Sequence, residues 1–151
     1  MAHFPVNHPA RPIYRAIGGL TGLYLAGFGV LGVIENSGAE FFAQNDTQVL
    51  GQGANLGYSV ISVILGVILL LAAVIGRNVD ATVNKFSGYA LMVLGLAELA
   101  VMRTDANYLD FSVATVIVSM TLGLVLMTAG LYGKVGTDEE THAWQEARLL
   151  L

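Results

Sequence analysis

Four long apolar stretches constrain this chain more than any other feature: residues 16–34, 56–76, 84–103 and 111–133. The first, second and fourth contain no charged residue. The third contains Glu98 and has Asn84, Lys85 and Arg103 at its two ends. A helix of about 20 apolar residues spans the hydrocarbon layer of a bilayer and satisfies its own backbone hydrogen bonds there. The sequence therefore predicts an all-α membrane protein that folds as a four-transmembrane-helix bundle.

The composition favours lipid as the surrounding solvent. Of the 151 residues, 55% are hydrophobic and 12% are charged, whereas soluble domains average about 25% charged residues. A soluble domain of this length has too little interior to bury so much apolar surface. The net charge of −4 and the lack of a basic patch argue against a nucleic-acid partner. Because the chain has no cysteine, disulfides, iron–sulfur clusters and thiol catalysis are excluded.

The positive charges indicate an orientation. Six of the seven Lys and Arg residues lie on one side of the predicted bundle: Arg11, Arg15, Arg77, Lys85, Lys134 and Arg148. Only Arg103 lies on the other side. Lys and Arg accumulate in cytoplasmic loops, so we predict a multi-pass plasma-membrane protein with both termini in the cytoplasm. The lipid bilayer is then its first expected partner.

The two segments outside the predicted bundle, residues 1–15 and 135–151, differ from each other. The first holds the three prolines of the chain, Pro5, Pro9 and Pro12. Since proline disfavours helix, we predict an extended cytoplasmic arm. In the second segment, Thr137 and Glu140 have capping-box spacing. The side chains that share one face of the helix that follows are Trp144, Ala147 and Leu151. This pattern predicts a short amphipathic helix at the cytoplasmic surface.

Two features relate the first half of the chain to the second. Residues 58–64 resemble residues 111–117, and Gly22 and Gly29 have the same spacing as Gly88 and Gly95. A duplicated helical hairpin, with its copies related by a pseudo-twofold axis along the membrane normal, explains both features. A chance match is the alternative, because apolar segments resemble one another easily.

Small residues recur at helical spacing in the first two stretches. Together with Trp144, they are the candidate helix-packing or partner-binding positions: Gly18, Gly22, Ala26, Ser62 and Gly66. Small residues let two helix backbones approach closely within a membrane. The pattern favours contacts within the bundle, and docking of a partner subunit is the alternative.

Glu98 is the one ionisable residue well inside an apolar stretch. A carboxylate within a membrane can relay protons, bind a cation or pair with a basic residue of a partner. Glu98 lies about one turn from the end of residues 84–103. The favoured interpretation is therefore a position at the level of the lipid headgroups, or a pair with Arg103 or a neighbouring helix.

The other candidate functional polar residues flank the apolar stretches. They are Asn55, Arg103, Asp105, Asn107 and Asp110. Asp105, Asn107 and Asp110, beside Arg103, form a polar cluster whose oxygen atoms can bind a cation, but they lack the spacing of a calcium loop. A solvated turn that caps the next helix is therefore favoured, and no metal site is predicted. Asn55 either lines a polar cavity or makes local hydrogen bonds, and the second role is favoured.

Short motifs between residues 14 and 134 carry a family resemblance. They are Tyr14-Arg15, Gly22-Leu23, Gly29-Val30-Leu31-Gly32, Asn55-Leu56-Gly57, residues 59–63 with Gly66, Asn84, Thr104-Asp105-Ala106-Asn107 and Gly130-Leu131-Tyr132-Gly133-Lys134. Together they resemble a four-helix family of small actinobacterial membrane proteins of unknown function. The resemblance implies four spans and an actinobacterial plasma membrane. It brings no catalytic residue to this chain.

No catalytic constellation is recognisable in the sequence. We therefore predict that the chain is not an enzyme and has no cofactor. The first hypothesis is a non-catalytic accessory or structural subunit of a larger plasma-membrane complex, such as a respiratory one, with other integral membrane subunits as partners. The alternative is a small oligomeric transporter or channel that uses Glu98 in the membrane. An enzyme that acts on lipid or quinone ranks last.

Overall fold

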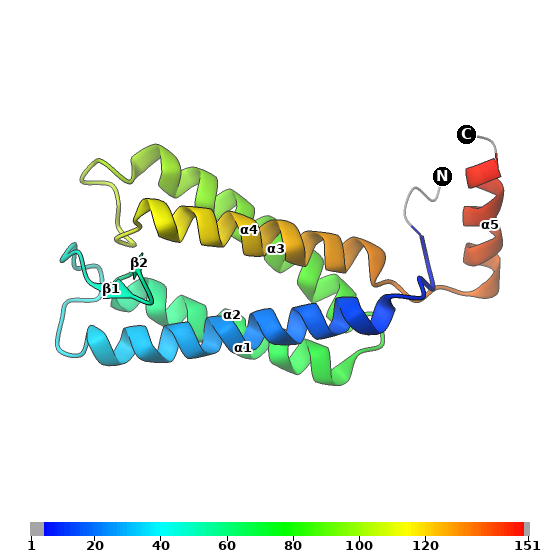
Figure 1. Ribbon diagram of the computed structural model, residues 1–151, viewed down its shortest axis with the longest axis horizontal. Coiled ribbons are helices and arrows are strands. Elements are labelled where there is room, and N and C mark those ends of the chain that lie inside the picture. Colours follow the sequence, from blue (N-terminus) through cyan, green and yellow to red (C-terminus); the bar gives the residue numbers. More distant parts are fainter. Residues whose placement is uncertain (1–4, 150–151) are drawn as a thin grey trace.

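The computed structural model describes residues 5–149. Four helices form an elongated bundle: α1 (Arg11–Glu35), α2 (Leu56–Ile75), α3 (Val79–Val101) and α4 (Val113–Tyr132). A fifth helix, α5 (Asp138–Leu149), lies across one end of this bundle (Figure 1). The predicted helical architecture is confirmed, with one addition. Between α1 and α2, β1 (Gln48–Val49) and β2 (Gln52–Gly53) form a two-stranded antiparallel ladder.

Within the described part of the chain, three helices are long and apolar enough to cross a membrane: α1, α2 and α4. The sequence predicts four. The remaining helix, α3, is 23 residues long, but Asp80, Lys85 and Glu98 make it less hydrophobic. The three apolar helices are consistent with a membrane protein.

Two helices begin earlier than the sequence predicts. α1 begins at Arg11 rather than at residue 16, so the predicted extended arm is wrong for residues 11–15. Pro12 lies in the first turn, where the missing N–H has no intrahelical acceptor to lose. α3 begins at Val79 rather than at residue 84. Its first turn contains the buried Asp80, which lies 3.6 Å from Arg11 of α1.

Neighbouring helices pack as two antiparallel hairpins, α1–α2 and α3–α4, and each hairpin contains a reciprocal glycine contact. A methyl group on Gly22 would lie 2.9 Å from the carbonyl oxygen of Gly66, and one on Gly66 would lie 2.7 Å from that of Gly22. Gly88 and Gly123 face each other in the same way. A methyl group on Gly88 would lie 2.7 Å from the carbonyl oxygen of Gly123, and one on Gly123 would lie 3.0 Å from that of Gly88. The two backbones of each hairpin are so close that a larger side chain would overlap the facing helix.

The two hairpins repeat one pattern of burial. Residues of α1 correspond to residues of α3 as follows: Gly18 to Asn84, Thr21 to Ser87, Gly22 to Gly88, Leu25 to Leu91, Gly29 to Gly95 and Gly32 to Glu98. Residues of α2 correspond to α4 in the same manner: Tyr58 to Thr115, Ser59 to Val116, Ser62 to Ser119, Gly66 to Gly123, Leu69 to Leu126 and Ala72 to Ala129. Two equivalent pairs of leucines, Leu25 with Leu91 and Leu69 with Leu126, meet in one core cluster.

The hairpins are therefore structural repeats, although one of the sequence matches is wrong in register. The likeness of residues 58–64 to residues 111–117 would pair Tyr58 with Phe111. In the structure, Tyr58 corresponds to Thr115, because the N-caps Asn55 and Ser112 occupy equivalent positions. The glycine spacing in α1 and α3 does agree with the structural correspondence.

One buried asparagine closes the loop of each hairpin. Asn36 donates hydrogen bonds from Nδ2 to the carbonyl oxygens of Gly32 (2.9 Å) and Ala54 (3.0 Å). Asn107 donates to those of Met102 (3.2 Å) and Phe111 (3.0 Å). Each asparagine joins the end of one helix to the residue before the N-cap of the next. We call the end that holds residues 36–55 and 102–112 the loop end, and the opposite end, which holds residues 5–10, 76–78 and 133–149, the terminal end (Figure 1).

Candidate functional site

Asn55 joins the two loops of the loop end. Its side chain is fully buried. As N-cap of α2 it accepts a hydrogen bond from the backbone N–H of Tyr58 (3.0 Å), and its Nδ2 donates to the carbonyl oxygens of Ala43 (3.2 Å) and Tyr108 (2.7 Å). All three partners are backbone groups. Ala43 belongs to the loop between α1 and α2, and Tyr108 belongs to the loop between α3 and α4. Asn55 thus has a structural role in positioning the loops relative to α2.

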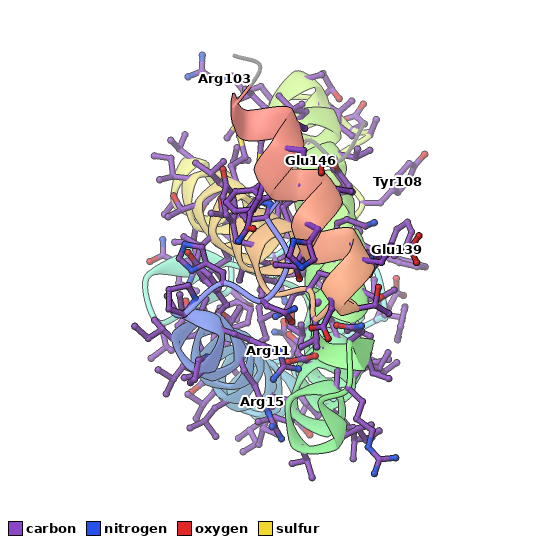
Figure 2. All side chains as sticks on the ribbon, turned by 90° about the vertical axis from the view of Figure 1, so that its right-hand side faces the viewer. Arg11, Arg15, Arg103, Tyr108, Glu139 and Glu146 are labelled. Atoms are coloured by element: carbon purple, nitrogen blue, oxygen red, sulfur yellow. The ribbon has the colours of Figure 1, made fainter. Side chains whose placement is uncertain are left out.

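The polar cluster expected at residues 103–110 divides into an outward half and an inward half. Arg103 and Asp105 are exposed, and Figure 2 shows Arg103 pointing away from the bundle. Asn107 and Asp110 are each only 8% exposed. Asn107 also accepts a hydrogen bond from Phe111 N (2.8 Å), so its amide is occupied in holding the loop. Asp110 differs, because one of its two carboxyl oxygens, Oδ2, is buried without a hydrogen-bond partner among the described residues.

Asp110 lines a cavity of about 240 Å³ between the two loops. The polar side chains around this cavity come from both hairpins: Asp46, Gln48, Asn107, Asp110 and Ser112. Within residues 5–149, the buried Oδ2 atom of Asp110 has no hydrogen-bond partner. Burial raises the pKa of the Asp110 carboxyl above its ordinary value of 3.8, and the charge of Asp46 raises it further. The backbone amides of Asn45 and Asp46 oppose this shift.

Glu98 belongs to the buried residues of α3 and is only 7% exposed. Its Oε2 atom is buried without a hydrogen-bond partner among the described residues, and no ion pair with Arg103 forms there. The equivalent residue of the first hairpin is Gly32, where a methyl group would overlap the side chain of Ser59. Since the first hairpin folds with glycine at this position, packing of the hairpin does not require a carboxylate.

The small residues considered as a packing or partner face lie inside the bundle. Gly22, Ala26 and Gly66 form the close contact between α1 and α2. Gly18 leaves room for the amide of Asn84, which would lie 2.5 Å from a methyl group there. Ser62 is 2% exposed and donates a hydrogen bond to the carbonyl oxygen of Tyr58 (2.8 Å). These positions serve contacts within the bundle.

An apolar cleft of about 290 Å³ lies between α2 and α3, where the two hairpins meet. Leu25, Ile61, Leu65 and Leu94 are among its walls, and Tyr58 contributes to one side. The hydroxyl of Tyr58 is bonded to Ser119 Oγ (3.1 Å). Because the Tyr58 hydroxyl is already hydrogen-bonded, the cleft offers an apolar surface, which suits an acyl chain rather than a polar substrate.

A set of contacts at the terminal end was not predicted from the sequence. The Nδ2 of Asn7 donates to the carbonyl oxygen of Gly136 and to Thr141 Oγ1, both at 3.0 Å. Asn78 exchanges two hydrogen bonds with the backbone of Val135, at 2.6 and 2.8 Å. The two asparagines fix the linker between α4 and α5 from distant parts of the chain. No local sequence pattern reveals such a pairing.

Two arginines of the terminal end also stabilise the helix ends. Arg15 donates to the carbonyl oxygens of Ala73 (2.5 Å) and Val74 (2.7 Å), in the last turn of α2. Arg11 lies 3.6 Å from the carboxylate of Asp80, which is 3% exposed. Figure 2 shows both arginines at this end of the bundle. Arg15 thus supplies donors to carbonyl oxygens at the end of α2, and Arg11 balances the charge of Asp80, although Asp80 Oδ1 and Arg11 Nε have no hydrogen-bond partner among the described residues.

α5 is an acidic helix that lies across the terminal end of the bundle. Thr137 and Glu140 form the predicted capping box, with bonds of 3.1 and 3.2 Å, and Lys134 binds Glu140 at 2.9 Å. The described part of α5 is not packed against α1, α2, α3 or α4 (Figure 1). Trp144 is half-buried, whereas Leu151, which the sequence places on the same face, lies outside the described residues.

No family model, curated protein or solved structure matches this chain. The resemblance to the actinobacterial four-helix family therefore stays a prediction.

Proposed function

We propose that this chain is a non-catalytic accessory subunit of a larger plasma-membrane complex. In this proposal α1 to α4 all cross the membrane, and both termini lie in the cytoplasm. α5 then lies at the cytoplasmic surface, where it contacts another subunit. The observation that carries the proposal is the placement of α5, held by a fixed linker yet not packed against the bundle.

The division of residues on α3 supports four spans. Its polar residues face the interior of the bundle, since Asn84, Ser87 and Glu98 are all buried. The exposed residues of the same helix from position 86 onward are apolar or aromatic: Phe86, Tyr89, Ala90, Val93, Leu96, Ala97, Leu99 and Ala100. A helix whose polar groups face its neighbours and whose apolar groups face outward is suited to lipid. Hydropathy averaged over the helix does not distinguish these two faces.

The distribution of positive charge supports the orientation. Arg11, Arg15, Arg77 and Lys134 belong to the terminal end, and Arg103 belongs to the loop end. Because Lys and Arg accumulate on the cytoplasmic side, the terminal end is assigned to the cytoplasm.

The fixed linker supports a docking role for α5. The side chains of Asn7 and Asn78 make four hydrogen bonds with Val135 and Gly136 in the linker. A fifth joins Asn7 to Thr141 in the first turns of α5, so the direction in which α5 leaves the bundle is set. Its charge is mainly negative, with acidic residues at positions 138, 139, 140 and 146 against Arg148. An acidic helix is repelled by anionic lipid headgroups, which favours a basic surface of a protein partner.

Purification of the tagged chain from its native membrane in mild detergent tests this proposal. We expect a membrane partner at constant stoichiometry, and a partner from a respiratory complex would match the sequence hypothesis. Replacing the exposed Glu139 and Glu146 by Lys should release the partner. The matched control replaces the exposed Glu35 and Asp105 of the loop end by Lys and should retain it. A wild-type chain that always elutes without a stoichiometric partner contradicts the proposal.

The alternative, a small oligomeric transporter or channel, rests on Glu98. We propose that duplication of one hairpin produced the bundle, and that the second copy acquired a carboxylate where the first has Gly32. A buried carboxyl oxygen without a partner suits transient binding of a proton or cation. Glu98→Gln should abolish flux in reconstituted vesicles, whereas Glu35→Gln, at the exposed end of α1, should not. Flux that is absent from the wild-type protein, or unchanged by Glu98→Gln, counts against this alternative.

A further inference from the structure

The cavity at the loop end is built from both hairpins. Asp46 and Gln48 belong to the loop between α1 and α2, whereas Asp110 belongs to the loop between α3 and α4. Its volume of about 240 Å³ has room for an ion together with several waters, since each water occupies about 30 Å³. A ligand bound here would touch both halves of the molecule.

The structure separates the groups that hold this cavity from the groups that are free to bind. The Asn107 amide is bonded to Met102, and the hydroxyl of Ser112 receives the N–H of Gly53 (3.0 Å). These side chains form the walls. Asp110 presents a carboxyl oxygen that is buried and has no hydrogen-bond partner in the described chain, and the exposed Asp46 supplies a second carboxylate.

An unpartnered buried carboxyl oxygen is costly, and three arrangements relieve the cost: protonation, a basic partner or a bound cation. No Lys, Arg or His lines this cavity among the described residues. The walls contain oxygen donors from carboxylates and an amide, with neither thiol nor imidazole. Such a set of ligands is typical of a hard cation rather than of zinc or copper.

We propose that this cavity is a binding site for a hard divalent cation of the Ca²⁺ type. The Oδ2 atom of Asp110 and the carboxylate of Asp46 are its charged ligands, and the cation joins the loop of one hairpin to the loop of the other. Two carboxylates and the amide oxygen of Gln48, which also lines the cavity, favour Ca²⁺ over Mg²⁺ when water completes the shell. Ca²⁺ tolerates irregular coordination, whereas Mg²⁺ requires a nearly regular octahedron.

The small number of charged ligands sets the expected affinity. Within residues 5–149, no group of three acidic, His or Cys residues is placed to hold a metal. Sites with few carboxylates bind Ca²⁺ with dissociation constants of about 10⁻⁴ to 10⁻³ M. Binding at this level stabilises the folded protein only when the ion reaches millimolar concentration.

Thermal unfolding of the full-length protein in detergent, with CaCl₂ as the probe, tests the site. At ten times the dissociation constant, we expect the unfolding temperature to rise by about 4 °C. Asp110→Asn and Asp46→Asn should each remove this rise. Asp105→Asn, which alters an exposed acid of the same loop, should leave the rise intact. Isothermal titration with CaCl₂ measures the binding directly.

Asp46→Asn keeps the test decisive even if Asp110→Asn fails to fold, because Asp46 is exposed. An equal rise with MgCl₂ or with NaCl at matched ionic strength overturns the assignment to Ca²⁺. A rise that survives Asp46→Asn, or the absence of any rise in the wild-type protein at 10 mM CaCl₂ (about ten times the weaker expected dissociation constant), overturns the site.

Discussion

The first hairpin, α1–α2, and the second, α3–α4, share a scaffold and differ in what they bury. Both use a reciprocal glycine contact and one buried asparagine per loop. Yet the first hairpin has Gly18 and Gly32 where the second has Asn84 and Glu98. The shared positions are those that backbone packing requires. The positions that differ are free to carry polar groups, and they are where function is best sought.

The largest expected effect comes from a leucine at the glycine contact. Gly66→Leu in the first hairpin and Gly123→Leu in the second should each destabilise the protein by at least about 3 kcal/mol, because the side chain would meet the backbone of the facing helix. Gly27→Leu is the control, since nothing lies within 4 Å of its added carbon. Unfolding in detergent measures all three. If only one hairpin were sensitive, the two would not be equivalent.

The buried loop asparagines should have the next largest effect. Asn36→Ala and Asn107→Ala each remove two side-chain hydrogen bonds to backbone carbonyl oxygens, at a cost of about 2–3 kcal/mol. Ser37→Ala, at an exposed position beside Asn36, should change the stability little. Comparable losses for the two asparagines support equivalent roles, whereas a loss confined to one would show that the loops are held differently.

The acidity of Asp110 predicts a smaller effect that depends on pH. Because burial and the charge of Asp46 raise the pKa of Asp110, the folded protein holds this proton more tightly than the unfolded chain does. Protonated Asp110 therefore adds to the free energy of unfolding below its ordinary pKa of 3.8. This contribution is lost as the pH rises through the raised pKa that Asp110 has in the folded protein. Asp110→Asn should remove this part of the pH dependence. Unfolding curves from pH 4 to 8, without divalent cations, measure it. A wild-type profile identical to that of Asp110→Asn contradicts the prediction.

The smallest effect concerns the terminal end. The hydrogen bond from Lys134 is the main reason why the pKa of Glu140 is lowered. Lys134→Ala should therefore move the pKa of Glu140 back toward 4.5, with little change in stability because the pair is exposed. An NMR titration of the Glu140 carboxyl measures the shift. An unchanged pKa would mean that Thr137, rather than Lys134, controls this carboxylate.

Local patterns in the sequence predict much of the fold. The apolar stretches locate all four helices of the bundle, and the glycines of α1 and α3 have the spacing of the structural repeat. The pair Thr137 and Glu140 predicts the start of α5. These features are local, because each depends on residues within a few turns of one another.

The features that the sequence does not reveal depend on contacts between distant residues. The contacts of Asn7 and Asn78 with the α4–α5 linker have no counterpart in spacing or composition. The cavity at Asp110 forms only when two loops meet. Pro12 was expected to keep residues 11–15 out of the helix, whereas proline is well suited to a first helical turn. The polar residues of α3 lower its mean hydropathy, and this average does not show that they lie on the buried face of the helix.

The proposed function has α3 cross the membrane as α1 does, in keeping with the equivalence of the hairpins. Single-cysteine labelling tests this most directly because the chain has no cysteine. Cysteines replace four exposed residues: Ser37 and Asp105 at the loop end, and Arg77 and Glu139 at the terminal end. In intact cells, an impermeant maleimide should label the first two and reach the last two only after lysis. Labelling of positions 37 and 105 from opposite sides of the membrane would contradict four spans and the equivalence of the two hairpins.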